Sequence, residues 1–165
     1  MTPLNYCLPD NRFATHVLDN GVAAACAQYG IPLIAYSPIG RGMLTSQFKK
    51  FEDIPKDSLL FQFNFPRFQK ENFDINVQLV EKVDELAKKK GCTTAQLAIN
   101  WTRALSRRPG MPTIIPIPGA TTLDRVEENS KLLDITDEEM AEIDTILAKF
   151  TPAGERAPPI IETDT

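Results

Sequence analysis

The chain has 165 residues, 42% of them hydrophobic, which is enough for one domain with a single core. Its 18 Lys and Arg and 22 Asp and Glu give a formal net charge of -4, so no overall basic field exists to attract nucleic acid or an anionic membrane. No apolar stretch approaches the roughly 20 residues needed to cross a bilayer, and the N-terminus lacks an export signal pattern, so we expect a soluble, cytoplasmic protein with no membrane partner.

The first predicted element is a helix over residues 22–27, which is rich in alanine; Gly30 suits the position just past its end. The run contains Cys26, which we expect to be a buried packing residue. Cys7, Cys26 and Cys92 are odd in number and lack CxxC or Cys/His spacing. They therefore argue against a disulfide framework and a metal site, and they fit a reducing compartment.

A strand is predicted over residues 31–36, an almost continuous apolar run of the composition typical of a parallel strand covered on both faces. A proline- and glycine-containing turn at residues 37–42 ends it. Residues 43–71 then show no sustained period but hold six phenylalanines. A solvated linker has no use for these rings, so we expect a long loop that packs over another part of the protein.

Two helices follow the loop. The first is predicted over residues 73–90, with a lysine run, residues 88–90, placed to cap its negative end before Gly91. The second begins with a capping box formed by Thr93 and Gln96 and ends before residues 109–110. Trp101, on its apolar stripe, is expected to be a core residue rather than a ligand contact.

A second strand over residues 113–117 is predicted to be buried, and a helix begins near Leu123. A capping box of Thr136 and Glu139 opens the last helix, and residues 151–165 are predicted to form an extended or disordered tail. Alternating strands and helices of these lengths indicate an α/β fold with parallel strands. No GxGxxG fingerprint follows either strand, so a (β/α) barrel is favoured over a doubly wound dinucleotide-binding sheet.

Two turns carry the candidate chemistry. In the first, Tyr36 ends a strand and is followed by Gly40 and Gly42, which allow a ligand to approach the backbone closely. A plain turn with a packed tyrosine explains this segment equally well. In the second, small and hydroxyl residues lead into a helix whose free N–H groups and positive end favour an anion.

Arg125 adds a full positive charge to the second turn, and its spacing to Glu128 and Asn129 places all three on one helix face. A cation, a carboxylate and an amide could there converge on one polar ligand. The alternative is an exposed ion pair of little energetic value, between Arg125 and Glu128 or between Glu127 and Lys131.

The strings AYSPIGRG (residues 35–42) and IPIPGATTLDRVEEN (residues 115–129), about 80 residues apart, closely resemble the seventh and eighth strand-loop motifs of the aldo-keto reductases. Residues 13–150 are similar to the C-terminal portion of that family. The strings KKKGCTTAQLAINW (88–101) and PRFQKENF (66–73) look most like its fungal pyridoxal reductase-like branch, and ITDEEMAEID (135–144) fits as well. The resemblance implies a partial (β/α)8 TIM barrel containing strands seven and eight, with residues 1–12 as a divergent segment.

The resemblance also implies an NADP(H) site. Tyr36 would stack on the nicotinamide, and the turn after it would follow the pyrophosphate through Ser37, Ile39, Gly40 and Gly42. Gly119, Ala120, Thr121 and Thr122 would line the 2′-phosphate and pyrophosphate, with Arg125 on the 2′-phosphate or the adenine, and Glu128 and Asn129 on the adenine. An arginine fork that recognises a 2′-phosphate favours NADP(H) over NAD(H). Many relatives have lysine where this chain has Gly119.

The family reduces an aldehyde or ketone by hydride transfer, with a catalytic tyrosine, lysine, aspartate and histidine from the earlier half of a barrel of eight strand-helix units. We expect none of these four here, since His16, the one histidine, precedes the first helix rather than following an early strand. Exposed strand edges would favour self-association. Three hypotheses remain: a reductase of a small carbonyl compound, pyridoxal for example, completed by another polypeptide; an inactive nucleotide-binding or interaction module; or a truncated gene product.

Overall fold

The computed structural model describes residues 21–155 and Pro158. Cys7, His16, the divergent segment 1–12 and most of positions 156–165 lie outside these residues. The described chain begins with α2 (Val22–Gln28), which ends through Gly30 at a φ of 64° and a hydrogen bond from the Ile31 N–H to the Cys26 carbonyl. Such a left-handed residue just past a helix is the position glycine favours, and the chain turns there directly into the first strand.

Two parallel strands form the sheet, β1 (Leu33–Tyr36) and β2 (Ile114–Ile117). Leu33 lies opposite Ile114 and Tyr36 lies opposite Ile117, so the two strands run in register and end at the same edge. The predicted α/β organisation, with parallel strands joined by a helical crossover, is confirmed. Within the described residues the sheet has these two strands and is open.

The crossover between the strands contains short helical turns and then two longer helices. In chain order they are η1 (Gly40–Thr45), η2 (Phe51–Asp53), α3 (Leu59–Gln62), η3 (Pro66–Phe68), α4 (Lys70–Lys90), α5 (Thr94–Ala104) and η4 (Leu105–Arg107). After β2 come α6 (Leu123–Ser130) and α7 (Asp137–Ala148). Both predicted capping boxes are present, one from Thr93 and Gln96 on α5 and one from Thr136 and Glu139 on α7.

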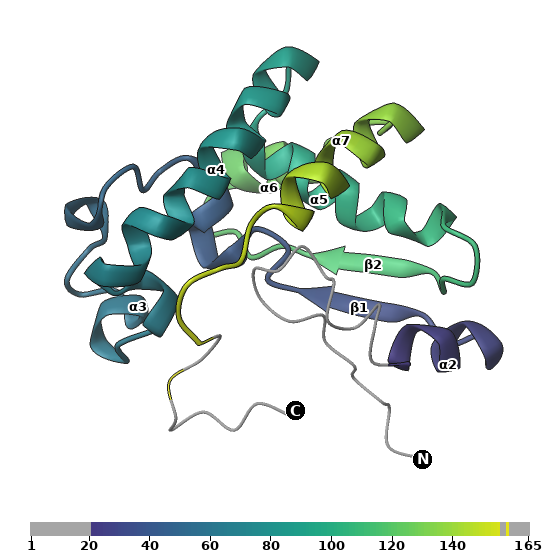
Figure 1. Cartoon of the computed structure of the whole chain (residues 1–165), viewed down its shortest axis with the longest axis horizontal. Coiled ribbons are helices and arrows are strands. Elements are labelled where there is room, and N and C mark those ends of the chain that lie inside the picture. The colour runs from purple at the N-terminus through teal and green to yellow at the C-terminus, as the bar shows by residue number, and fades with distance from the viewer. Residues whose placement is uncertain (1–20, 156–157, 159–165) are drawn as a thin grey trace.

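The core lies between the sheet and the helices on one side of it. Figure 1 shows α4, α5 and α7 on the same side of the two strands, and Leu33, Ala35 and Ile114 are buried there with Trp101 of α5. Trp101 is thus a core residue, as predicted. Cys26 is also buried, and burial raises the pKa of its thiol. A neutral thiol inside an apolar cluster is a packing residue.

The opposite face of the sheet is uncovered, and here the sequence prediction was wrong. Burial alternates along both strands, and Ile115 and Ile117 are 43% and 50% exposed. The continuous apolar composition predicted strands covered on both faces. Helices cover one face only, and no second layer lies over the other within the described part of the chain. We call this surface, with Ile115 and Ile117 at its centre, the open sheet face.

The phenylalanine-rich loop packs against the core, as expected, although it contains three short helical turns. Phe65 and Phe68 are buried, and the Phe48 and Phe68 rings meet edge to face with their centroids 6.4 Å apart. Phe61 and Phe63, in and just after α3, stay exposed. The loop therefore lies over the α4 end of the core, where η3 contacts α4.

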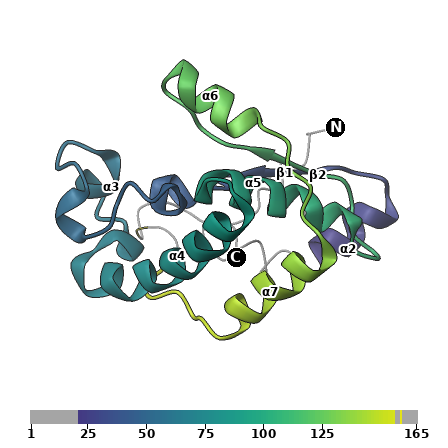
Figure 2. The ribbon, with the colours of Figure 1, turned by 90° about the horizontal axis from the view of Figure 1, so that it is seen from above.

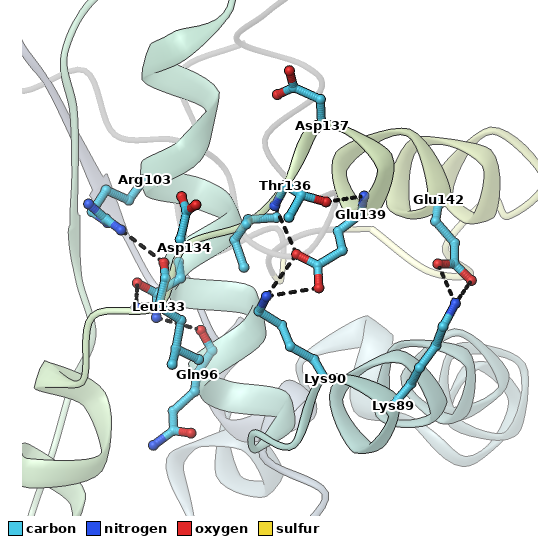
Figure 3. A network of polar contacts seen from close by, with 12 residues as sticks. Lys89, Lys90, Gln96, Arg103, Leu133, Asp134, Thr136, Asp137, Glu139 and Glu142 are labelled. Carbon is cyan, nitrogen blue, oxygen red and sulfur yellow. Dashed lines mark hydrogen bonds and ion pairs between the residues drawn. The ribbon is translucent and has the colours of Figure 1, made fainter.

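The lysine run at the end of α4 binds carboxylates of neighbouring segments rather than only capping its own helix. Lys90 lies 2.8 Å from a Glu139 carboxylate oxygen and Lys89 lies 3.1 Å from Glu142, and both acids belong to α7 (Figure 3). Lys88 pairs with Asp84 one turn earlier on α4. The contacts of Lys89 and Lys90 join α7 to α4 across the surface of the core.

Candidate functional site

The two predicted turns meet at one edge of the sheet. Residues 37–42 follow Tyr36 and residues 118–122 follow Ile117, and these two strand-terminal residues are partners in the parallel register. Parallel strands of an α/β fold place their ligand-binding loops at the carboxyl ends. The structure thus brings together the two segments that the sequence singled out 80 residues apart.

The first turn has an unusual backbone. Ser37, directly after β1, has a φ of 51°, and Gly40 and Gly42 have φ values of 58° and 93°. The Gly40 N–H donates to the Ser37 carbonyl and closes the turn. A Cβ on Gly42 would lie 3.2 Å from the Phe48 ring. Any other residue at position 42 would therefore require the Phe48 ring to move. A non-glycine residue held in the left-handed region is a feature of ligand-binding turns.

Ile39 seats this turn on α5. Its side chain is buried and packs with Ala95 and Ile99 of that helix. Its carbonyl accepts hydrogen bonds from the N–H groups of Gly42 and Leu44. Of the predicted cofactor residues in the first turn, Ile39 therefore supports the backbone from below, whereas Tyr36 and Ser37 are half-buried at the strand end.

The second turn is exposed over residues 119–122 and leads into α6. Thr122 caps the helix, since its hydroxyl accepts from the Arg125 N–H at 3.4 Å. The Asn129 side-chain amide donates to the Gly119 carbonyl, also at 3.4 Å, and folds the turn back toward the helix. A Cβ on Gly119 would meet nothing within 4 Å, so the space beside this turn is open.

One face of α6 carries the predicted polar residues. Arg125, Glu128 and Asn129 are half-buried, whereas the other residues of the helix are exposed. Neither of the alternative ion pairs, Arg125 with Glu128 or Glu127 with Lys131, forms in the described chain. The Arg125 guanidinium has no hydrogen-bond or ion-pair partner among the described residues, whereas Arg103, Arg107 and Arg108 bind carbonyl or carboxylate oxygens.

A polar cluster that the sequence analysis missed holds the end of the first turn. The Asp84 carboxylate accepts from the hydroxyls of Ser46 at 3.1 Å and Thr94 at 2.8 Å. The hydrogen-bonded Lys88 ammonium lowers the pKa of Asp84, and the two hydroxyls act in the same direction against a partial burial that raises it. Asp84 is therefore an ionised anchor between α4, α5 and the segment after β1.

Two buried amides of α5, Gln96 and Asn100, were also missed. They contact the backbone of α6 and of the segment after it. Their signal in the sequence is a pair of polar residues four apart inside an otherwise apolar helix stripe. The sequence pattern by itself assigns Gln96 to the capping box only.

Over residues 21–155 and Pro158, no three His, Cys, Asp or Glu side chains gather where they could hold a metal ion. None of the helices in that stretch has both the length and the apolar composition to span a bilayer.

These features define a strand-turn-helix portion of an α/β protein. The candidate site at its strand ends suits a ligand that has both an anionic group and an aromatic ring. The model of the aldo/keto reductase family matches residues 4–148, and the chain belongs to that family. The sequence pattern predicts that the resemblance begins at Phe13, whereas the family match begins earlier, at residue 4. The chain is 35% identical over 153 residues to the "Putative pyridoxal reductase" of Saccharomyces cerevisiae, covering 87% of this chain and 44% of that protein.

Solved structures show the same fold. The glycerol dehydrogenase from Gluconobacter oxydans superposes with a TM-score of 0.62 at 24% identity, over 90% of this chain and 42% of that one. A thermostable aldo-keto reductase in complex with the inhibitor epalrestat gives a TM-score of 0.51 at 22% identity, over 79% and 35%. The chain therefore has a mixed α/β fold that matches part of an aldo-keto reductase barrel, and it spans less than half the length of these relatives.

Proposed function

We propose that this chain forms the NADP(H)-binding portion of an aldo-keto reductase that reduces an aldehyde or ketone. In this proposal β1 and β2 are the seventh and eighth barrel strands. The main support for this proposal is that β1 and β2 end side by side, at Tyr36 and Ile117. Arg125, whose guanidinium has no partner among the described residues, lies in the first turn of α6, the helix after β2. Family membership supports the reaction class.

The residues at this edge fit a dinucleotide phosphate. The Arg125 guanidinium has no acceptor within the described chain, and the space beside Gly119 is open. The first turn of α6 adds free N–H groups and the positive end of the helix dipole. Asp124, exposed in that same turn, opposes an anion, so the arginine must supply the net attraction. We assign the 2′-phosphate to Arg125 and residues 119–122.

The other end of the cofactor lies along the first turn. Tyr36, half-buried at the end of β1, offers its ring to the nicotinamide, and the backbone of Ser37, Gly40 and Gly42 lines the pyrophosphate. Ile39 supports that turn from beneath. Glu128 and Asn129, on the inner face of α6, complete the site at the adenine, where a carboxylate and an amide can pair with its amine and ring nitrogen.

The bound cofactor would supply hydride to a carbonyl carbon. In this proposal the residues of the chain bind and orient it and contribute no proton donor. The donor and its assisting groups would come from the barrel portion that the longer relatives possess beyond their similarity to this chain. Pyridoxal is the first substrate to test, because the yeast relative carries that activity in its name.

The test is a fluorescence titration of the purified chain with NADPH and NADH, followed by NADPH oxidation with pyridoxal. We expect saturable binding that favours NADPH. Absence of NADPH binding overturns the proposal. The open sheet face favours a second candidate, a nucleotide-binding module without turnover of its own, because a closed barrel would cover that face. Since the chain contributes no proton donor in either case, NADPH binding without oxidation is the result expected of both.

A further inference from the structure

Helix α6 is not held in place by the hydrophobic core. None of its residues is buried, and its two large apolar side chains, Leu123 and Val126, are 70% and 51% exposed. Figure 2 shows α6 at the periphery, well away from α4 and α7. A short helix without a buried apolar face has little stability of its own, so other contacts must fix its position.

Two buried amides on α5 make these contacts. The Gln96 side chain donates to the Glu128 carbonyl at 3.2 Å. The Asn100 side chain donates to the Lys131 carbonyl at 2.9 Å and accepts from the Leu133 N–H at 3.0 Å. Gln96 is 7% exposed and Asn100 is 1% exposed. Together they satisfy backbone groups at the C-terminal end of α6, where a helix leaves its carbonyls without intrahelical partners.

The same helix also supports the first turn. Ala95 and Ile99 pack against Ile39, and the Thr94 hydroxyl lies 2.9 Å from that of Ser46 at the end of η1. One side of α5 thus seats the turn after β1, and its neighbouring side holds the helix after β2. Because both contacts belong to one rigid helix, α5 sets the separation between the two turns.

We propose that Gln96 and Asn100 are positioning residues, which hold α6 and thereby Arg125 at the distance from residues 37–42 that a bridging dinucleotide requires. The assignment of the ligand rests on the proposed function. The anchoring of α6 rests on the hydrogen bonds alone. Neither amide touches the cofactor in this proposal; each acts through the backbone of the helix it holds, as supporting groups do in preorganised sites.

Hydrogen exchange on the chain without cofactor tests the anchoring. Asn100→Leu keeps the number and branching of the side-chain heavy atoms but removes both the donor and the acceptor. We expect faster exchange of the amides of residues 123–133, with α4 and the rest of α5 still protected. The matched control is Thr102→Val on the same helix, because the Thr102 hydroxyl bonds only within α5, to the Ala98 carbonyl at 2.9 Å. It should leave α6 unchanged.

A second variant tests the same anchoring in case Asn100→Leu unfolds the whole chain. Gln96→Glu retains an oxygen for the Thr93 N–H, so the cap of α5 survives, but it loses the donor to the Glu128 carbonyl. It should loosen the same segment. If residues 123–133 exchange at the rate of the unchanged chain in both variants, or if only general unfolding is seen in both, the anchoring role is overturned.

NADPH titration of the same proteins then tests the positioning role. Losing such buried hydrogen bonds should raise the Kd for NADPH about tenfold and reduce the preference over NADH, while Thr102→Val leaves both unchanged. Faster exchange in α6 with an unaltered Kd overturns positioning. An unchanged chain that binds no NADPH overturns the proposed function instead, and the exchange data still decide whether the two amides hold α6.

Discussion

In the proposed function, Arg125 determines the preference for NADPH over NADH. Its guanidinium finds no acceptor in the described chain, so Arg125→Ala breaks no side-chain hydrogen bond or ion pair there. A charge-assisted contact to the 2′-phosphate contributes about 2 kcal/mol, and NADPH binding should weaken by that amount while NADH binding changes little. Isothermal titration with both cofactors measures the difference. Equal losses for the two would contradict the assignment.

A matched control is available on α4. Lys82 is exposed and pairs with Glu85 on the same helix, so Lys82→Ala removes one positive charge from a residue outside the proposed site. It should leave both affinities unchanged. An equal effect of this variant would mean that overall charge, and not the position of Arg125, governs binding.

A substitution at Gly119 should strengthen NADPH binding rather than weaken it. It does not have a positive φ, and a Cβ there meets nothing within 4 Å, so a side chain fits without strain. Gly119→Lys places an exposed cation beside the proposed phosphate and should strengthen NADPH binding by up to about 1 kcal/mol. Gly119→Ala, which adds no charge, is the control and should have no effect. Weaker NADPH binding by Gly119→Lys would mean that the phosphate lies elsewhere.

At the scale of elements, Lys90 and Glu139 join α4 to α7 (Figure 3). Burial raises the pKa of Glu139, but the Lys90 ammonium and the Thr136 N–H outweigh it and hold the pKa below its ordinary 4.5. Because the folded pKa is the lower one, this stabilisation is complete above pH 4.5 and is lost as pH falls through the folded value. Glu139→Gln keeps an oxygen for the cap and should cost about 1–2 kcal/mol at pH 7.

Urea unfolding followed by Trp101 fluorescence between pH 3 and 7 checks this, since the buried ring reports on the core. The difference between the unchanged chain and Glu139→Gln should shrink as the pH falls below about 4.5. Glu142→Gln, at the more exposed pair with Lys89, is the control and should have a smaller effect. A difference that stays constant with pH would show that the ion pair does not link the helices.

The sequence predicted these elements where local chemistry decides them. The capping boxes at Thr93 and Thr136, the core position of Trp101 and the meeting of the two turns follow from side-chain type, helix period and strand direction. The exposure of Ile117 could not be predicted, because an apolar strand residue reads alike whether or not another layer covers it. The contacts of Asn100 were missed since they depend on a segment 31 residues away.

Across the whole described part of the chain, the open sheet face stands out as two exposed isoleucines on one side of a two-stranded sheet. We propose that the chain self-associates through it and its strand edges, because exposed apolar side chains and unpaired strand groups favour pairing with another chain. Ile117→Lys should shift sedimentation toward the monomer without lowering the unfolding midpoint. Leu132→Lys, at an apolar residue that is 74% exposed but lies outside the sheet, is the control. Unchanged association in Ile117→Lys would exclude this face as the interface.

In the proposed function, one dinucleotide lies across the two strand ends. Titrating NADP⁺ into the isotope-labelled chain and following backbone amide chemical shifts tests it directly, without any need for turnover. We expect the shifts to concentrate in two separate segments, residues 36–42 and 119–129, and to saturate together at one Kd. Shifts limited to one of these segments, or centred on α4 and α7, would contradict the claim.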